Sequence, residues 1–256
     1  MVHSERTLEL TDAAAVRAVF AGPIRALHSP RVAGGTVTSW RSAILKSQIH
    51  GPVVVGPLGL AGDAQKEKRH HGGPTKAVLV YGAEHYPQWS YTLGAHAAAH
   101  ADALRTMSTD FDASHFGFGA FGENLTVSAL SEERVCLGDI WCVGGCVLRI
   151  TEPRGPCATL ARRWLHPTLA ADVRENAAAG WYNEVVESGP VCEGDALTLV
   201  SRMQDRWTVA RVFHLLESRR VSASDVRDLM ADPCCHEELR ARLERRLSTP
   251  GRISND

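Results

Sequence analysis

Short runs of β-branched residues, separated by glycine, recur along most of this chain and limit its possible folds more than any other feature. Between Pro23 and about Val200 such runs include residues 35–38, 52–55 and 77–81. β-Branched side chains pack well on a pleated sheet, and closely spaced short strands favour a barrel or sandwich over alternating βαβ units. The sequence therefore predicts a mainly β fold, with the barrel domain spanning residues 22–201.

The clearest single element is a hairpin around Gly144-Gly145. Residues 140–143 and 146–150 flank this pair, which suits the positive φ angles of a tight two-residue turn. In addition, the pattern Val-Cys-x-Gly-Asp occurs at residues 135–139 and again at 191–195, each time before an apolar run. We interpret both copies as Gly-Asp turns that enter strands.

Helical spacing interrupts the strands twice, around residues 82–105 and from Cys157 to about Glu175. Residues 1–21 are predicted to be an N-terminal extension with one short helical stretch around residues 13–19. Residues 202–256 are predicted to form a small all-α domain of three helices with a tail, packed against the barrel or a second subunit.

Several signals define the three C-terminal helices, which we expect at residues 207–217, 224–230 and 236–247. Thr208 and either Ser222 or Ser224 are candidate N-caps, and Asp232-Pro233 separates the second helix from the third. The last helix carries an arginine cluster, which we interpret as a solvated face: Arg240, Arg242, Arg245 and Arg246.

Composition argues against several classes of protein. The net charge of −1 provides no overall field that would favour nucleic acid or an anionic membrane. The N-terminus lacks the apolar core of a secretory signal, and the apolar run at residues 52–60 is too short to cross a membrane. Seven cysteines without a dense framework are typical of reduced thiols. We expect a cytoplasmic protein with no nucleic-acid or membrane partner.

The first stretch with informative chemistry is residues 63–76, where Arg69, His70 and His71 precede Gly72-Gly73. Glycines let the backbone approach a ligand closely, and adjacent cationic donors suit a phosphate or another oxyanion. The alternative is a basic surface turn that leads into the strand at Ala77.

The second stretch, residues 118–127, is a glycine-rich loop that feeds a strand, with Glu123 and Asn124 at the junction. An asparagine offers donors and an acceptor, which suits recognition of a heterocycle edge. The alternative is an ordinary turn in which Asn124 satisfies nearby backbone groups.

The third stretch, residues 151–157, leaves the hairpin and enters a helix through a loop fixed by two prolines and a glycine. Cys157 falls near the start of that helix, three residues after Arg154, and both features stabilise a thiolate. An activated thiol is either a nucleophile or a soft metal ligand. The alternative is a buried, inert cysteine.

Taken together, these motifs resemble the MOSC family, named for the molybdenum cofactor sulfurase C-terminal domain. The segments that carry the resemblance are residues 46–47, 59–63, 69–74, 122–126, 135–139 and 153–157, with support from 83–87 and 180–182. The three-helix tail points to the YiiM-like branch, whose MOSC domain is followed by a small all-α domain. The resemblance covers about residues 23–248 and leaves residues 1–21 outside it.

The resemblance implies a β-barrel with helical insertions that holds a molybdopterin-type molybdenum cofactor, with Cys157 as the protein ligand to the metal. The further cofactor-binding residues that it implies, for the pterin phosphate, the pterin body and the cofactor edge, are Lys46, Ser47, Arg69, His70, His71, Gly72, Asn124, Thr126 and Arg154. The catalytic set is Cys157 with Asp63, His70 and His71, the last three as alternative proton relays. Pyridoxal phosphate is not expected.

The activity implied by the resemblance is two-electron reduction of N-hydroxylated compounds, such as hydroxylamino-purines, amidoximes or N-oxides, in a detoxifying role. The sequence contains neither a plant-type Cys-x4-Cys-x2-Cys run nor a dinucleotide fingerprint. We therefore expect electrons from an external reductase. The sequence does not decide the oligomeric state, for which a homodimer is a candidate. The alternatives are a cofactor carrier or sulfur-transfer protein without turnover, and a binding module without molybdenum.

Overall fold

The computed structural model describes residues 13–29, 38–66, 72–249, 251 and 253–254. Its largest element is an eight-stranded sheet, in which β7 and β8 pair in parallel and the other neighbours are antiparallel. In spatial order the strands are β13 (Leu197–Ser201), β9 (Ile140–Val143), β10 (Cys146–Pro153), β11 (Trp181–Glu187), β7 (Val78–Gly82), β8 (Leu125–Val127), β1 (Val16–Ala21) and β4 (Ser47–Gln48).

This sheet curls without closing, so the predicted barrel is wrong for the described residues. Residues at the start of β1, the strand next to edge strand β4, reach the other end of the sheet. Ala15 bridges Ala196, the Val16 amide donates to the Asp195 carbonyl at 2.8 Å, and the Gly194 and Leu197 amides donate to the Val16 and Ala14 carbonyls at 2.9 and 2.8 Å. The body of β1 is already paired with β8 and β4, which leaves only the residues at its start to reach β13. In the part of the chain that the structure describes, helix and strand make up 31% and 28%, so the fold is mixed and sheet-rich rather than mainly β.

The described residues form three smaller sheets besides the main one. They are the hairpin of β2 (Arg25–His28) and β3 (Ser39–Ser42), the three-stranded sheet of β12 (Gly189–Val191), β5 (Val53–Gly56) and β6 (Gly59–Leu60), and the parallel pair of β14 (Val221–Ser222) and β15 (Ile253–Ser254).

The N-terminal segment corrects one prediction. Residues 16–21 form strand β1, which lies between β8 and β4, and not the end of an extension. The short helix expected around residues 13–19 is also wrong. The run Val-Arg-Ala-Val-Phe-Ala buries Val16 and four of its last five residues, because β1 has neighbouring strands on both sides and packs into the core. Burial in a sheet overrides the mild helical preference of the alanines.

The hairpin and both Gly-Asp turns are confirmed. Val143 pairs with Cys146 across a two-residue turn, in which only Gly144 has a positive φ, of 56°. In the two repeats the aspartate accepts a hydrogen bond from the cysteine amide three residues earlier, at 2.9 Å for Asp139 and 2.8 Å for Asp195. This local bond explains why the same five-residue pattern begins a strand twice.

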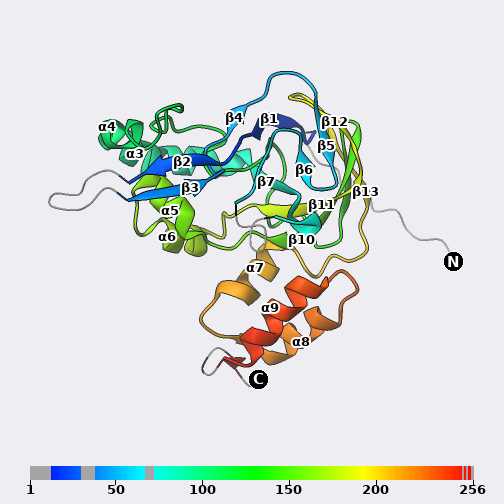
Figure 1. Cartoon of the computed structure of the whole chain (residues 1–256). Coiled ribbons are helices and arrows are strands. Elements are labelled where there is room, and N and C mark those ends of the chain that lie inside the picture. Colours follow the sequence, from blue (N-terminus) through cyan, green and yellow to red (C-terminus); the bar gives the residue numbers. More distant parts are fainter. Residues whose placement is uncertain (1–12, 30–37, 67–71, 250, 252, 255–256) are drawn as a thin grey trace.

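Both helical insertions are also confirmed. The first is a chain of single turns: η2 (Ala83–His85), α2 (Tyr86–Trp89), the π-helical η3 (Ser90–Gly94), α3 (Ala95–Ala99) and α4 (Ala101–Arg105). The second consists of α5 (Ala158–Trp164) and α6 (Leu169–Asn176), and a short 3₁₀ turn, η1 (Pro74–Lys76), precedes β7. In Figure 1 these helices lie beside the β2–β3 hairpin, where their apolar faces build a second core around Tyr81, Phe121 and Trp164.

The three C-terminal helices are α7 (Val209–Glu217), α8 (Ala223–Ala231) and α9 (Glu237–Leu247), as the spacing predicts. Thr208 caps α7 by accepting from the Arg211 amide at 3.2 Å, and Ser222 caps α8. In Figure 1 the helices lie below the sheet, and their buried leucines and valines belong to the same apolar cluster as Trp141 and Trp181. They share a core with the sheet. None of the described helices is long and apolar enough to cross a membrane.

The arginine cluster of α9 departs from the predicted solvated face. Arg242 pairs with the buried Glu152, Arg246 is only 9% exposed, and Arg240 donates to the Met230 carbonyl at 3.0 Å. Arg245 alone among the four is exposed. Their guanidinium groups satisfy carboxylate and carbonyl oxygens at the junction between the helices and the sheet.

The inside of the curled sheet is filled with side chains. A cavity of about 10 Å³ is left between Val80, Leu125, Trp141 and Trp181, which is about the limit for one water molecule. A cofactor therefore does not fit inside the sheet. The room for a ligand lies outside it, against the β10–α5 loop.

Candidate functional site

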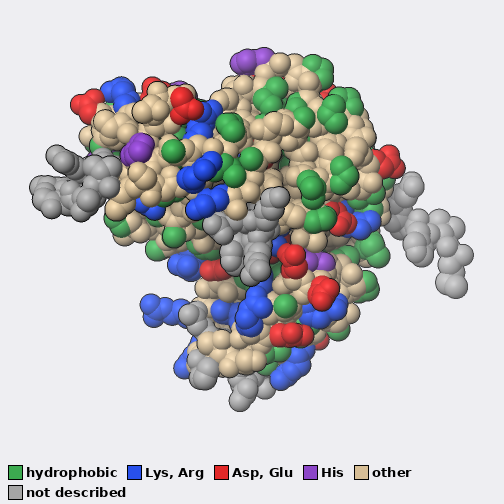
Figure 2. Space-filling view, viewed as in Figure 1, with side chains coloured by type: hydrophobic (Ala, Val, Ile, Leu, Met, Phe, Trp, Pro, Cys, Tyr) green, Lys and Arg blue, Asp and Glu red, His purple; other side chains and the backbone are tan. Residues whose placement is uncertain are grey.

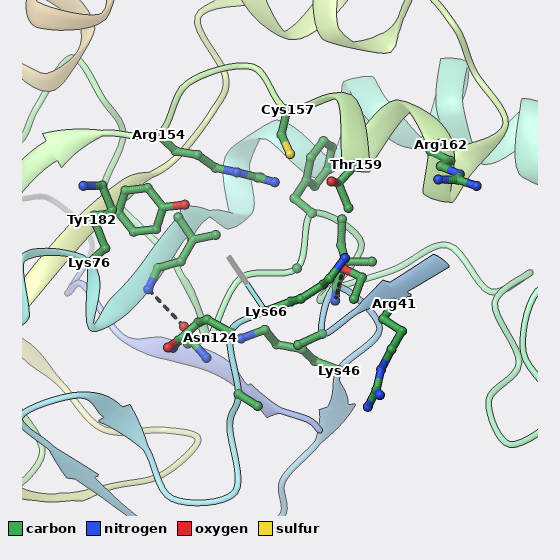
Figure 3. A pocket seen from close by; sticks show the side chains of 18 of the residues that line it. Arg41, Lys46, Lys66, Lys76, Asn124, Arg154, Cys157, Thr159, Arg162 and Tyr182 are labelled. Carbon is green, nitrogen blue, oxygen red and sulfur yellow. Dashed lines mark hydrogen bonds between the residues drawn. The ribbon is translucent and has the colours of Figure 1, made fainter. Parts of the chain in front are cut away.

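A pocket of about 260 Å³ lies between the β2–β3 hairpin, the β10–α5 loop and the start of α5. Figure 3 shows its side chains converging from several segments far apart in the sequence. The lining residues are Trp40, Arg41, Ser42, Ala43, Ile44, Lys46, Ala64, Gln65, Lys66, Lys76, Leu79, Phe121, Gly122, Asn124, Arg154, Cys157, Thr159, Arg162 and Tyr182. The chain thus builds this pocket by folding, not from one contiguous motif.

Cys157 lines the pocket from the N-cap position of α5, where its backbone is extended with φ −120° and ψ 124°. In Figure 3 its sulfur points into the cavity, and the Arg154 side chain reaches toward it. Arg154 is 6% exposed and its amide donates to the Gly180 carbonyl at 3.0 Å. A cation beside a thiol favours the thiolate, so the local environment suits a metal ligand or a nucleophile.

Gly180 makes this arrangement of the loop possible. Its φ is +76°, and a Cβ at this position would lie 2.4 Å from the Val80 carbonyl oxygen. Its amide donates to the buried Glu132 at 2.7 Å while its carbonyl accepts from Arg154. Only glycine satisfies this conformation and this close approach together.

One side of the pocket is organised by a buried carboxylate. Asp63, with a side chain 1% exposed, pairs with Lys46 at 2.6 Å and accepts from Asn124 Nδ2 at 2.9 Å and from the Gly22 amide at 3.1 Å. Burial lowers the pKa of Lys46, and the charge of Asp63 opposes that effect. Asp63 therefore holds Lys46 and Asn124 in place from behind the cavity.

Asn124 is bound to the scaffold on both sides of its amide. Its Oδ1 accepts from the Leu79 amide at 3.1 Å, and its Nδ2 donates to the Phe20 carbonyl at 3.2 Å as well as to Asp63. These bonds tie three strands together at the pocket wall. The alternative interpretation, in which Asn124 satisfies backbone groups, describes its observed contacts, although the backbone groups belong to other strands.

Cations dominate the polar lining. Six of the lining residues are Lys or Arg, and none of the described lining residues is Asp or Glu. The six are Arg41, Lys46, Lys66, Lys76, Arg154 and Arg162. The buried carboxylates of Asp63 and Glu152 offset the charges of Lys46 and Lys76, and the remaining excess of cations in this partly enclosed site favours an anionic ligand.

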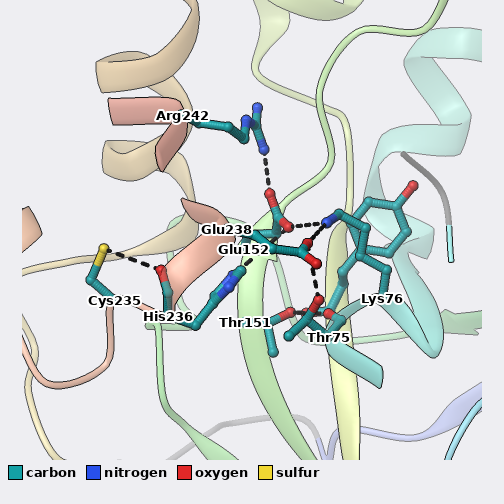
Figure 4. A network of polar contacts seen from close by, with 9 residues as sticks. Thr75, Lys76, Thr151, Glu152, Cys235, His236, Glu238 and Arg242 are labelled. Atoms are coloured by element: carbon teal, nitrogen blue, oxygen red, sulfur yellow. Dashed lines mark hydrogen bonds and ion pairs between the residues drawn. The ribbon is translucent and has the colours of Figure 1, made fainter. Parts of the chain in front are cut away.

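A buried ion network links the pocket to the C-terminal helices (Figure 4). Glu152, fully buried on β10, pairs with Lys76 at 2.8 Å and with Arg242 of α9. Lys76 also pairs with Glu238, and His236 lies 3.8 Å from Glu152. Because Glu152 is two residues before Arg154, α9 is fastened to the strand end that carries the Cys157 loop.

Apolar and aromatic groups complete the pocket wall. Arg162 lies over the Trp40 ring with its Cζ 4.6 Å from the ring centroid, and Phe121 stacks on Tyr81. Burial raises the pKa of Tyr182 to about 12, with the nearby Cys157 and Glu152 adding to the effect and Arg154 opposing it. The Tyr182 phenol therefore keeps its proton near neutral pH.

The predicted site residues fall into three groups. Cys157, Lys46, Asn124 and Arg154 line the pocket. Asp63 lies behind it, whereas Ser47, which is exposed, Gly72 and the buried Thr126 are not among its lining residues. Arg69, His70 and His71 lie outside the described residues, so their predicted roles stay predictions.

Sequence reasoning missed Arg41, Lys66, Lys76, Arg162 and Tyr182 as pocket residues. Lys66 and Lys76 lie inside the basic stretch at residues 63–76, and Tyr182 lies in the 180–182 motif, so a signal existed for these three. Arg162 is five residues after Cys157 on α5, a spacing that carries no motif. Arg41 lies in a strand whose partner could not be deduced without the fold.

The donor set fits an anionic, planar cofactor that brings most of its own metal ligands. The described residues contain no group of three or more His, Cys, Asp and Glu placed to hold a metal ion. A cofactor that carries its own metal ligands therefore fits the described part of the site, where Cys157 is the lining residue suited to bind a soft metal. Six cations suit phosphate and thiolate charges, and Trp40, Phe121 and Tyr182 offer flat apolar surface to a heterocycle.

Comparison with known proteins places these features in context. Residues 67–198 match the family described as the MOSC domain. A Gibberella moniliformis protein named Reductase is 35% identical over 74% of this chain, and Escherichia coli protein YiiM is 34% identical over 64%. The matched regions span 30% and 66% of those proteins' lengths, less than two thirds of either. The crystal structure of YiiM from Geobacillus stearothermophilus superimposes with a TM-score of 0.68 at 25% identity, covering 91% of this chain and 99% of that one.

Proposed function

The chain belongs to the MOSC domain family, and from this membership we propose that its pocket binds a molybdenum cofactor with Cys157 as the protein ligand to the metal. One observation carries the proposal: the Cys157 sulfur opens into a pocket lined by six cations. A thiolate is a soft ligand suited to such a metal, and the cations offset the negative charge of the cofactor.

The two sides of the pocket suggest how the cofactor is oriented. In Figure 3 Arg154 lies on the Cys157 side, whereas Arg41, Lys46 and Lys66 lie across the cavity. We assign the cofactor phosphate to the latter three, because phosphate is recognised by clustered cationic donors. Arg154 then lies beside the metal-binding sulfur, where its positive charge stabilises the thiolate.

The proposed reaction is reduction of an N-hydroxylated compound: the N–O bond breaks, and two electrons and two protons yield the amine and water. When bound, the molybdenum cofactor supplies the oxygen-removing and electron-transfer chemistry. The chain supplies the thiolate, the cationic cradle and the orientation. Tyr182, whose pKa is raised to about 12 by burial, remains a neutral hydrogen-bond donor in the pocket. The name of the fungal Reductase supports an oxidoreductase.

The test is expression in a host that makes molybdenum cofactor, followed by measurement of bound molybdenum and pterin. Turnover of a hydroxylamino-purine is then followed with dithionite-reduced methyl viologen as electron donor. We expect molybdenum and pterin near one equivalent and measurable turnover. Cys157→Ser should abolish turnover, whereas the control Cys142→Ser, in the distant β9–β10 hairpin, should retain it.

The outcomes separate the alternatives. Bound cofactor without turnover of N-hydroxylated compounds would favour the carrier or sulfur-transfer function. A folded protein that never acquires molybdenum or pterin would contradict both functions, and full activity of Cys157→Ser would remove the ligand assignment.

A further inference from the structure

A second, larger groove lies outside the pocket, at the junction of α6 with the end of α7 and with α9. Its volume is about 840 Å³, and five arginines line it: Arg174, Arg219, Arg242, Arg245 and Arg246. Figure 2 shows Lys and Arg side chains on both sides of this junction between the sheet body and the C-terminal helices. The groove shares no lining residue with the Cys157 pocket.

The groove is strongly positive. Its five arginines outnumber Glu217, the one carboxylate among its lining residues, and the buried Glu152 that pairs with Arg242, so the groove carries excess positive charge on a chain whose net charge is −1. Glu217 pairs with Arg174 at 3.3 Å. Arg219 and Arg245 are exposed, and no acidic side chain among the described residues pairs with either. Two outward guanidinium groups are therefore available for carboxylates of another molecule.

The groove lies against the loop that carries Cys157. A Cβ on Gly155 would lie 3.6 Å from Arg242 Nη2 and 3.7 Å from Glu217 Oε1, and both of these residues line the groove. Gly155 is two residues before Cys157, so their Cα atoms are at most about 7.6 Å apart. A partner in the groove would thus come close to the Cys157 loop without entering the Cys157 pocket, with which the groove shares no lining residue.

We propose that this groove, formed by the five arginines above, is the docking surface for an acidic electron-transfer protein. The inference rests on the proposed function, because that reaction consumes two electrons per substrate. The chain contains no iron–sulfur run or dinucleotide fingerprint to supply them. The donor is a small protein with a surface rich in Asp and Glu that carries an iron–sulfur cluster or flavin. Two molecules of a one-electron iron–sulfur donor, or one molecule of a fully reduced flavin donor, are oxidised for each substrate molecule, and with two protons their two electrons convert the N–O compound to the amine and water.

The physical form of the groove fits a transient protein complex. Opposite charges steer association and speed it at low salt without requiring a large buried area. Electron-transfer encounters are among the smallest and weakest specific interfaces. Separate entry for donor and substrate also lets both be bound in the same catalytic cycle.

The first experiment measures binding without requiring cofactor. The immobilised chain is titrated with an acidic plant-type [2Fe–2S] ferredoxin at low and high NaCl. We expect saturable binding that weakens with salt, and about tenfold weaker binding for Arg219→Glu/Arg245→Glu. The control Arg105→Glu/Arg227→Glu changes the net charge equally at exposed positions outside the groove and should bind as the wild type does. The milder Arg219→Gln/Arg245→Gln should be intermediate, which keeps the test valid if charge reversal impairs folding.

The second experiment compares two electron donors for the cofactor-loaded protein. The groove variant should show a raised KM for ferredoxin and unchanged turnover with reduced methyl viologen. Equal ferredoxin affinity in the groove variant and the control variant would overturn the docking surface. An equal loss of turnover by the groove variant with ferredoxin and with methyl viologen would overturn it as well. Binding of inorganic phosphate in the groove without any binding of ferredoxin would overturn it too. Absence of viologen turnover in the wild type would instead contradict the proposed function.

Discussion

At the scale of single residues, the site depends on charges held inside the protein. Lys46 is buried against Asp63, and the same carboxylate holds Asn124 and the Gly22 amide. A buried ion pair is weak evidence for stability, because desolvation offsets the attraction. Removing one partner is costly, however, since the other charge is left uncompensated.

We predict that Asp63→Asn lowers the free energy of unfolding by about 3–5 kcal/mol and prevents cofactor retention. Lys46 would lose its counter-charge at a position where burial already lowers its pKa. Urea unfolding measures the loss. The control Asp102→Asn removes an exposed i,i+3 pair with Arg105 and should cost less than about 1 kcal/mol. Equal effects of the two substitutions would show that the Asp63 pair is not important.

Two histidines should give opposite pH dependences. Burial lowers the pKa of His85, but the hydrogen bond and charge of Glu132 outweigh it, so the pKa is raised. Its stabilising contribution is present below about pH 6.5 and is lost as pH rises through the raised folded pKa. Burial lowers the pKa of His236, against the raising effect of Glu152. Its stabilising contribution is present above about pH 6.5 and is lost as pH falls toward the lowered folded pKa.

Urea unfolding at a series of pH values checks this pair of signs. In the wild type, deprotonation of His85 should lower the free energy of unfolding above about pH 6.5, and His85→Gln should remove this decrease. Protonation of His236 should lower the free energy of unfolding below about pH 6.5, and His236→Gln should remove that decrease. The informative quantity is the difference between wild type and each variant, because other groups titrate in the same range. Differences that change with pH in the same direction for both variants would contradict the assigned environments.

Residues near the site differ in how far the sequence alone identifies them. Cys157 and Arg154 share one rigid loop, so their proximity follows from local spacing. Asn124 was predicted to contact a ligand, yet its amide is used to join strands that only the fold brings together. Arg41 could not be identified, because it reaches the pocket through the pairing of β2 with β3. Whether such a residue lines the pocket depends on how the strands pair in the fold and not on a sequence motif.

At the scale of elements, the β10–α5 loop and α9 act as one unit. Glu152, the next-to-last residue of β10, is held by Lys76 and by Arg242 of α9. Hairpin, caps and helix ends were predictable here because each depends on neighbours within four residues. The ion network around Glu152 could not be predicted from the sequence, because its members come from three segments more than 70 residues apart.

We predict that Glu152→Gln destabilises the protein by about 3–5 kcal/mol, because Lys76 and Arg242 lose a shared buried counter-charge. Glu184→Gln is the matched control on the neighbouring strand β11. Its pair with Arg149 is partly exposed, and we expect a loss below about 1 kcal/mol. Thermal unfolding of both variants measures the difference, and a loss for Glu152→Gln no larger than that of the control would argue against a network that fastens α9.

At the scale of the whole molecule, the chain combines a curled sheet with a filled interior and a pocket at its outer side. The spacing of the short β-branched runs predicted a sheet but could not distinguish a closed barrel from an open, curled sheet, because closure depends on how the edge strands meet. The C-terminal helices were predicted as a small domain, yet they share the apolar cluster of the sheet. A three-helix segment of this size buries too little surface alone, so joining the larger core stabilises it.

The proposed function depends on a bond between the Cys157 sulfur and molybdenum. X-ray absorption at the molybdenum edge, recorded on cofactor-loaded wild type, Cys157→Ser and the control Cys142→Ser, tests it directly. We expect one sulfur neighbour fewer around the metal in Cys157→Ser than in the other two proteins. The same number of sulfur neighbours in all three spectra would contradict it.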